Sequence, residues 1–162
     1  MAYAYSITTV LDTIRRLIVQ DLSAQGEPPT AVPYSFTAAQ YALTSASELP
    51  LTVIEVKDGQ VERGQGVNTR SFHLPLIVHH YRAREAGTNG ETVALSRLAH
   101  LAATIENDPK LSALAPPVSM HETRPKLPAV SGDSALSASP QNVSIAHASL
   151  EMEVSWDEFR WQ

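Results

Sequence analysis

The longest regular pattern in the chain is a strict alternation of apolar and polar residues from Ala146 to Asp157. Its apolar positions are Ala146, Ala148, Leu150, Met152, Val154 and Trp156, and its polar positions are His147, Ser149, Glu151, Glu153, Ser155 and Asp157. A period of two over this length predicts a β-strand with one buried face. At roughly 3.3 Å per residue the strand extends about 40 Å, whereas most strands contain about five or six residues. We therefore expect it to outrun the core of its own domain, with a register fixed by the buried face.

Two other segments repeat apolar residues with the spacing of an amphipathic helix. Residues 7–23 place them at i, i+3, i+4 and i+7, with Ser6 as the N-cap. Thr88–Glu91 has the sequence of a capping box, and the apolar spacing continues from it to Ile105, before Asp108 and Pro109 end the helix. The sequence thus predicts two main α-helices.

Shorter stretches have the composition of strands or extended chain. They are Ala31–Tyr41, Leu51–Lys57, Ser71–Arg82 and Val118–Glu122. Asp58 and Gly59 are typical of a hairpin turn between two of these stretches. Pro75 cannot donate a ladder hydrogen bond, so we expect an edge, a bulge or a strand start at that position.

Two polar segments, residues 58–69 and 124–142, separate the predicted elements as extended loops. Loops of this length in a compact domain are usually functional or disordered. The helices and strands follow one another without a regular β-α-β alternation, which favours the α+β class. We predict one domain over residues 1–162, with an antiparallel or mixed β-sheet packed by two main α-helices.

The composition narrows the possible function classes. The formal net charge is -5 at pH 7, which gives no electrostatic basis for sequence-specific nucleic-acid binding. The chain contains no cysteine, which excludes disulfides, thiolate zinc sites and thiol nucleophiles and fits a reducing compartment. No apolar run approaches the roughly 20 residues of a bilayer span, and the N-terminus lacks the pattern of a signal peptide. We therefore expect no membrane partner.

Histidine is the only residue type that suggests catalysis or metal binding. The histidines are His73, His79, His80, His100, His121 and His147. Adjacent His79 and His80 point to opposite faces of a strand, and His73 lies about 20 Å from His79 on one face, so neither pair can chelate a metal. Glu151 and Glu153 could act as paired carboxylates, but they also belong to a polar strand face whose charges keep it soluble. Because no nucleophile elbow, P-loop or dinucleotide fingerprint is present, we predict no enzyme activity, catalytic residue, cofactor or metal site.

The candidate contact residues lie outside the predicted core. Phe159, Arg160 and Trp161 follow the alternating strand, and aromatic residues with arginine are enriched at interface hot spots. Arg15 and Arg16 lie off the apolar stripe of the first helix, where they form either a solvated face or a contact for an acidic partner. We expect the strand face with Glu151 and Glu153 to meet solvent, a lumen or a neighbouring molecule.

The order of elements resembles the tail terminator, or tail completion, proteins of tailed bacteriophages. The resemblance covers most of the chain. It consists of an amphipathic first helix, a sheet, a second helix, a short strand, a variable loop and a terminal alternating strand. The second helix runs into the sequence Ile105-Glu106-Asn107-Asp108-Pro109-Lys110-Leu111. The resemblance implies a structural virion protein that forms a hexameric ring at the head-proximal end of the tail tube. Such a ring terminates tail polymerisation and provides a surface for head-tail joining.

The resemblance also implies the partners and the location of the protein. The partners are other copies of the chain, the tail tube protein and head-completion or neck proteins, with a sheath or collar protein within reach of the two long loops. Assembly takes place in the host cytoplasm, and the finished ring belongs to the virion. An acidic chain suits a channel through which genome DNA passes, because a basic lumen would bind phosphate strongly.

Three alternatives stay open at this point. The first is another neck, connector or minor tail protein of similar layout. The second is a small soluble enzyme that uses His121, His147 and Glu151 around the long loop. The third is a monomeric binding module with the C-terminal aromatic residues in its site.

Overall fold

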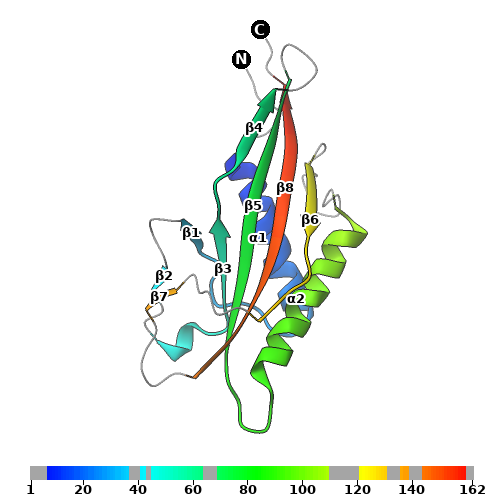
Figure 1. Cartoon of the computed structure of the whole chain (residues 1–162). Coiled ribbons are helices and arrows are strands. Elements are labelled where there is room, and N and C mark those ends of the chain that lie inside the picture. The colour runs from blue at the N-terminus through cyan, green and yellow to red at the C-terminus, as the bar shows by residue number, and fades with distance from the viewer. Residues whose placement is uncertain are drawn as a thin grey trace.

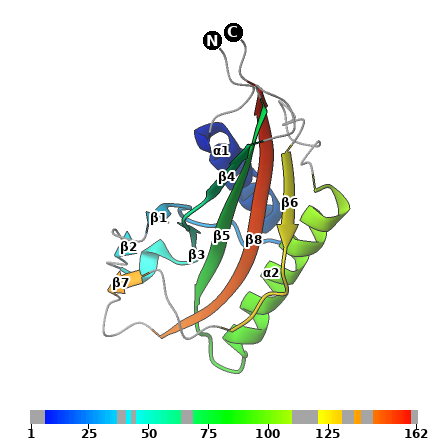
Figure 2. The ribbon, with the colours of Figure 1, turned by 45° about the horizontal axis from the view of Figure 1, so that its top comes forward.

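The computed structural model describes residues 7–36, 41–42, 45–63, 69–109, 121–130, 136–138 and 144–159. It has an α+β fold in which two helices pack against one face of a six-stranded mixed sheet (Figure 1). The helices are α1 (Ile7–Ala24) and α2 (Gly90–Asn107), and a short 3-10 helix spans Ala46–Glu48. Figures 1 and 2 show α1 crossing behind the central strands, while α2 runs along the side that carries β6.

The main sheet has the strand order β1-β3-β5-β8-β6, and β4 also pairs with β5. Its strands are β1 (Tyr34–Phe36), β3 (Leu51–Val56), β4 (Gln60–Arg63), β5 (Thr69–Ala83), β6 (His121–Pro125) and β8 (Ile145–Phe159). Only the β1–β3 pair is parallel, so the sheet is mixed. A second sheet joins β2 (Tyr41–Ala42) to β7 (Leu136–Ala138) as parallel strands.

The strands β5 and β8 form the long axis of the molecule. They pair antiparallel over their whole lengths, from Thr69 with Phe159 to Ala83 with Ile145. The apolar positions of the predicted alternation are all buried: Ala146, Ala148, Leu150, Met152, Val154 and Trp156. From Ala148 onward these side chains join the core formed with α1 and α2, which confirms the predicted strand and its buried face.

Both predicted helices are present, with one change at the start of α2. Its N-cap is Asn89, whose side chain accepts a hydrogen bond from Thr92 N–H at 3.1 Å, so the predicted capping box at Thr88 was placed one residue too early. Gly90, the first residue of α2, lies close to β8, because a Cβ at this position would lie 2.6 Å from Cβ of Ala146.

Pro75 lies within a central strand and not at an edge of the sheet. Its carbonyl accepts a hydrogen bond from Lys57 N–H at 3.0 Å. The proline nitrogen, which carries no hydrogen, therefore also faces the chain that joins β3 to β4. The register there changes from Val56 opposite Leu76 to Gln60 opposite His73, which places one extra residue on the facing chain. This is the geometry of a β-bulge, one of the three predicted outcomes, and it removes the need for a proline donor.

The two predicted loops contain more structure than expected. Residues 58–69 include β4, which pairs with β5 as the first strand of a hairpin. Residues 124–142 include the end of β6, a bridge between Ala129 and Ser149, and β7. The short strand predicted over Val118–Glu122 overlaps β6, which the structure describes from His121 to Pro125; residues 118–120 lie outside the described part of the chain. The strands β4 and β7 were not predicted, because pairing with another strand, and not local periodicity, creates them.

Neither α1 nor α2 has the length and apolar character that crossing a membrane requires. Most polar residues of both helices lie on their exposed sides, although Thr13 and Asp21 of α1 are buried, and the buried apolar residues form one core with the sheet. A smaller cluster of Leu51, Val53 and Tyr81 is buried on the opposite face of the sheet.

Candidate assembly surface

The sheet extends past both helices as a tip formed by three strands (Figures 1 and 2). We define the tip as residues 60–63 of β4, 69–73 of β5 and 155–159 of β8, which are paired side by side. At its base the rings of Phe72 and Trp156 stack with centroids 5.3 Å apart and planes 8° apart. On the other face, His73 Nδ1 lies 3.3 Å from Glu153 Oε1, and His73 Nε2 lies 3.6 Å from Glu62 Oε2. Strand pairing and side-chain contacts on both faces thus hold the tip together.

The outer edge of β4 leaves backbone groups unpaired. In an antiparallel pair, alternate residues direct both N–H and C=O toward the same neighbour. Lys57 N–H donates to the Pro75 carbonyl, so the backbone N–H and C=O groups of odd-numbered β5 residues point toward β3 and β4. The backbones of His73 and Ser71 therefore bond to those of Gln60 and Glu62. The N–H and C=O of Val61 therefore point away from the sheet. No described strand pairs with β4 on that side, and the Val61 residue is 57% exposed.

The opposite edge of the tip is the end of β8. The odd-numbered residues of β8 face β6, because the Glu151 carbonyl accepts from Lys126 N–H and Ser149 exchanges two bonds with Ala129. The last β8 residue that β6 pairs with is Trp156. Residues 157–159 pair with β5 on one side, and no described strand pairs with them on the other.

The outer edge of β6, in contrast, is closed to strand pairing. The N–H of Thr123 points outward and donates to the carbonyl of Pro109 at 2.8 Å, next to the end of α2. Pro125, the next residue that faces outward, has no N–H to donate. Natural sheets block their edges in such ways to prevent unwanted association. The β6 edge is thus blocked, whereas no described strand covers either edge of the tip.

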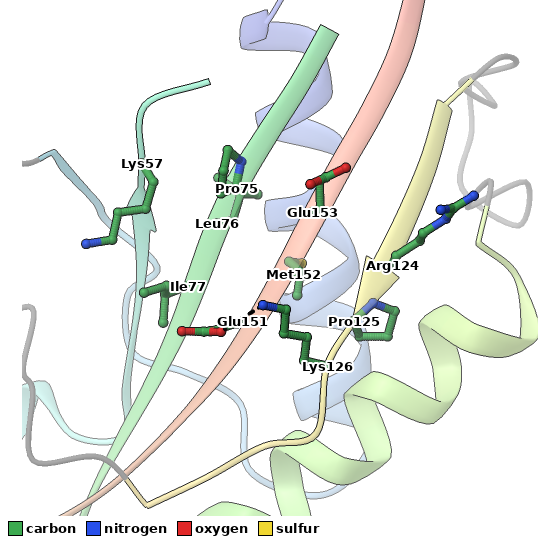
Figure 3. Close-up of a pocket in the computed structure, with 10 residues that line it drawn as sticks. All are labelled: Lys57, Pro75, Leu76, Ile77, Arg124, Pro125, Lys126, Glu151, Met152 and Glu153. Atoms are coloured by element: carbon green, nitrogen blue, oxygen red, sulfur yellow. Dashed lines mark hydrogen bonds and ion pairs between the residues drawn. The ribbon is translucent and has the colours of Figure 1, made fainter. Parts of the chain in front are cut away.

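The face of the sheet opposite the helices carries a shallow groove of about 550 Å³ (Figure 3). Its charged side chains pair with neighbours on the sheet. Lys126 Nζ lies 3.3 Å from Glu151 Oε2, Arg124 Nε lies 3.1 Å from Glu122 Oε1, and Lys57 pairs with Glu55. Figure 3 shows the amine of Lys57 and the guanidinium of Arg124 pointing away from the centre of the groove. The groups do not converge on one point, as a catalytic site requires, so the groove suits a contact surface.

The predicted contact residues do not form one cluster. Glu151 and Glu153 lie exposed on the groove face, as their alternation predicted. Arg15 lies on α1, where its guanidinium carbon is 5.8 Å from the centroid of the Tyr34 ring, while the neighbouring Arg16 is exposed. The Tyr34 hydroxyl in turn donates to Asp12 Oδ1 at 3.2 Å. Arg15 therefore has a partner inside the molecule.

Of the three C-terminal candidate residues, the structure describes only the first. Phe159 is the last residue of β8 and pairs with Thr69 at the end of the tip. Arg160 and Trp161 lie outside the described residues. The structure thus places the start of this predicted contact segment at the free edge of the tip.

A buried polar cluster around Glu27 was not predicted. His80 Nε2 lies 2.6 Å from Glu27 Oε2, Arg82 Nε donates to Oε1 at 2.9 Å, and Arg97 Nε lies 3.5 Å from Oε2. Burial alone would raise the pKa of Glu27, but hydrogen bonds and charge from His80 and Arg82 outweigh it and lower this pKa to about 2. The cluster ties the chain after α1 to β5 and α2. Its partners are 53 and 55 residues away from Glu27, so no local spacing in the sequence could indicate it.

Two histidines and a glutamate form a second unpredicted chain of contacts on the groove side of the sheet. His79 Nε2 lies 2.9 Å from Glu55 Oε1, and His79 Nδ1 lies 2.9 Å from His147 Nε2. The ring of His147 stacks on Tyr81 with centroids 4.4 Å apart. Burial would raise the pKa of Glu55, but its bonds with Lys57 and His79 lower this pKa. The alternation of β8 did place His147 on this face, but not its partners.

The described residues contain no group of three histidine, aspartate or glutamate side chains that could hold a metal ion. His147 and Glu151, two of the three residues of the enzyme alternative, are four residues apart on β8, or about 13 Å. Glu151 is engaged by Lys126, and the side chain of His121 is not among those described.

Comparison with known proteins adds no assignment. No protein-family model matches the chain, and a search of curated proteins finds no significant match.

Proposed function

We propose that the protein is a structural component of a phage virion, a tail terminator that assembles as a hexameric ring at the head-proximal end of the tail tube. The ring terminates tail polymerisation and provides the surface for head-tail joining. In this role the chain is not an enzyme and needs no cofactor. Its partners are other copies of itself, the tail tube protein and head-completion or neck proteins.

The observation that carries this proposal is the tip. The β5–β8 ladder is 15 residues long in each strand, about 50 Å, and it runs past the helices that cover its core. On two opposite sides it ends in edges that no described strand covers, and the charged groups described in the groove do not converge on one point. Two different edges on one subunit allow head-to-tail contacts, and such contacts close into rings when the rotation between copies fits.

The groove face is consistent with a wall of a channel for DNA. Its described charges are paired at short range, as in the contacts of Lys126 with Glu151 and of Lys57 with Glu55. A surface whose cations are already neutralised holds the phosphate backbone weakly, because nucleic-acid affinity depends on free cationic charge.

Electron microscopy tests the proposal. The purified chain should form six-fold rings, and a gold-labelled antibody against it should mark the head-proximal end of the tail in particles from the genome that encodes the chain. Label elsewhere on the neck or tail would indicate a connector or minor tail protein and contradict the terminator role. Particles without label would contradict the proposal altogether.

A further inference from the structure

The two edges of the tip that no described strand covers lie close in level along the sheet. Val61 pairs with Phe72, and Phe72 pairs with Trp156, the last β8 residue that β6 covers, so the uncovered residues 157–159 of β8 begin one position beyond the level of Val61. The outer edge of β4 can therefore accept a further strand, and residues 157–159 of β8, on the other side of the same three strands, can act as that strand for a second copy.

The strand directions also match. Both β4 and β8 run antiparallel to β5, so they run parallel to each other. Copies placed side by side in the same orientation bring the end of β8 in one copy against β4 in the next as parallel strands. Pairing of this kind uses one edge from each copy, so it can continue from copy to copy until a ring closes.

We infer that neighbouring copies of the chain join through the tip, with the outer edge of β4 at Val61 in one copy paired to residues 157–159 of β8 in the next. This inference rests on the proposed ring and specifies the contact that builds it. The occupant of each edge is a second copy of the chain, which extends the sheet across the subunit boundary.

The other edges of the sheet do not offer a matching pair. The β6 edge is closed by the bond from Thr123 to Pro109 and by Pro125. The edge at β1 is three residues long, and at its level the opposite side of the sheet is occupied by residues 126–129, which bond to β8. Among the described strands, only the tip has a free edge on both sides. The exposed Val61 within β4 adds an apolar side chain that the pairing would cover.

Disulfide trapping provides the test, because the chain has no cysteine of its own. Val61→Cys is combined in turn with Asp157→Cys, Glu158→Cys and Phe159→Cys in the full chain, and each variant is oxidised mildly and run on a non-reducing gel. We expect a ladder of linked oligomers from a double variant. Because side chains alternate along a strand, Glu158→Cys should behave differently from both of its neighbours. Each single variant should give dimers at most.

A matched control combines Val61→Cys with Arg124→Cys, which is exposed on the closed β6 strand and should give no ladder. Circular dichroism confirms that each variant is folded. Rings seen by microscopy without a ladder from any double variant would overturn this inference and leave the proposed ring in place. A ladder from the Arg124 control, or extensive dimers from Val61→Cys alone, would also overturn it. A chain that shows neither rings nor ladders would contradict both proposals.

Discussion

Nε2 of His80 lies 2.6 Å from Oε2 of Glu27, and both residues are buried. Because the pKa of Glu27 is lowered to about 2, the carboxylate is ionised at neutral pH and can only accept, so His80 donates this bond. The same carboxylate receives Arg82, and it lies beside Arg97. One side chain thus neutralises cationic groups from β5 and α2.

Glu27→Gln should therefore destabilise the fold strongly. The substitution keeps the shape of the side chain but leaves buried cations without their counter-charge, which costs about 3–5 kcal/mol in comparable buried pairs. Urea denaturation followed by circular dichroism measures the change. Glu106→Gln, on the exposed side of α2, is the matched control and should change the free energy of unfolding by less than about 0.5 kcal/mol. Equal effects of the two substitutions would show that the Glu27 cluster contributes nothing specific.

The same carboxylate predicts how stability depends on pH. The pKa of Glu27 is about 2 in the folded chain against 4.5 for the ordinary side chain, so its contribution is complete above pH 4.5. As the pH falls from 4.5 toward 2, the unfolded state takes up the proton first and the contribution is lost, by roughly 1–3 kcal/mol. Unfolding measured at steps across this range should show a smaller loss in Glu27→Gln than in the wild-type chain. Parallel curves for the two proteins would rule out this linkage.

Neighbouring residues on β8 should respond very differently to truncation. Leu150 is fully buried, and Leu150→Ala should cost about 2–5 kcal/mol because it leaves a cavity between sheet and helices. Glu151 is exposed and only pairs with Lys126, so Glu151→Ala should cost no more than about 1 kcal/mol. Thermal or chemical unfolding of the two variants compares them directly. A large loss from Glu151→Ala would mean that this face is buried in solution.

The contact between Gly90 and Ala146 leads to a prediction opposite to that from helix propensity. Alanine in place of glycine favours a helix by about 1 kcal/mol, but a Cβ at position 90 would lie 2.6 Å from that of Ala146. We expect Gly90→Ala to destabilise the protein by about 1–3 kcal/mol, as overpacked sites do. Adding Ala146→Gly removes the clash and should recover part of that loss. A stabilised Gly90→Ala variant would show that α2 does not approach β8 this closely.

The elements that local patterns specify were predictable. The helical spacing of residues 7–23 and the alternation up to Trp156 each identify an element and its buried face without knowledge of its neighbours. Boundaries were less predictable, because Thr88 and Asn89 are both residue types that cap helices and only the fold shows that Asn89 caps α2. The strands β4 and β7 depend on pairing with β5 and β2, and their own sequences are short.

The surface features depended even more on the fold. The alternation placed Glu151 and Glu153 on an exposed face, but their neighbours Lys126 and His73 come from other strands. The free edge at Val61 follows from the bulge opposite Pro75 and from the pairing of β4, which no local pattern contains. Sequence reasoning therefore identified the long strand and its surplus length, while the structure was needed to find where its unpaired edges lie.

The central claim is that copies of the chain assemble through the tip, and native mass spectrometry of Val61→Pro tests it most directly. Proline is tolerated on an edge strand where the N–H faces outward, so the fold should remain intact while the donor at position 61 is removed. Val61→Thr, which keeps the N–H, is the control. We predict that the wild-type chain and Val61→Thr form hexamers of the 17.6-kDa chain, whereas Val61→Pro stays monomeric with an unchanged circular dichroism spectrum. Hexamers of Val61→Pro as abundant as those of the wild-type chain, or a wild-type chain that never assembles, would contradict the account.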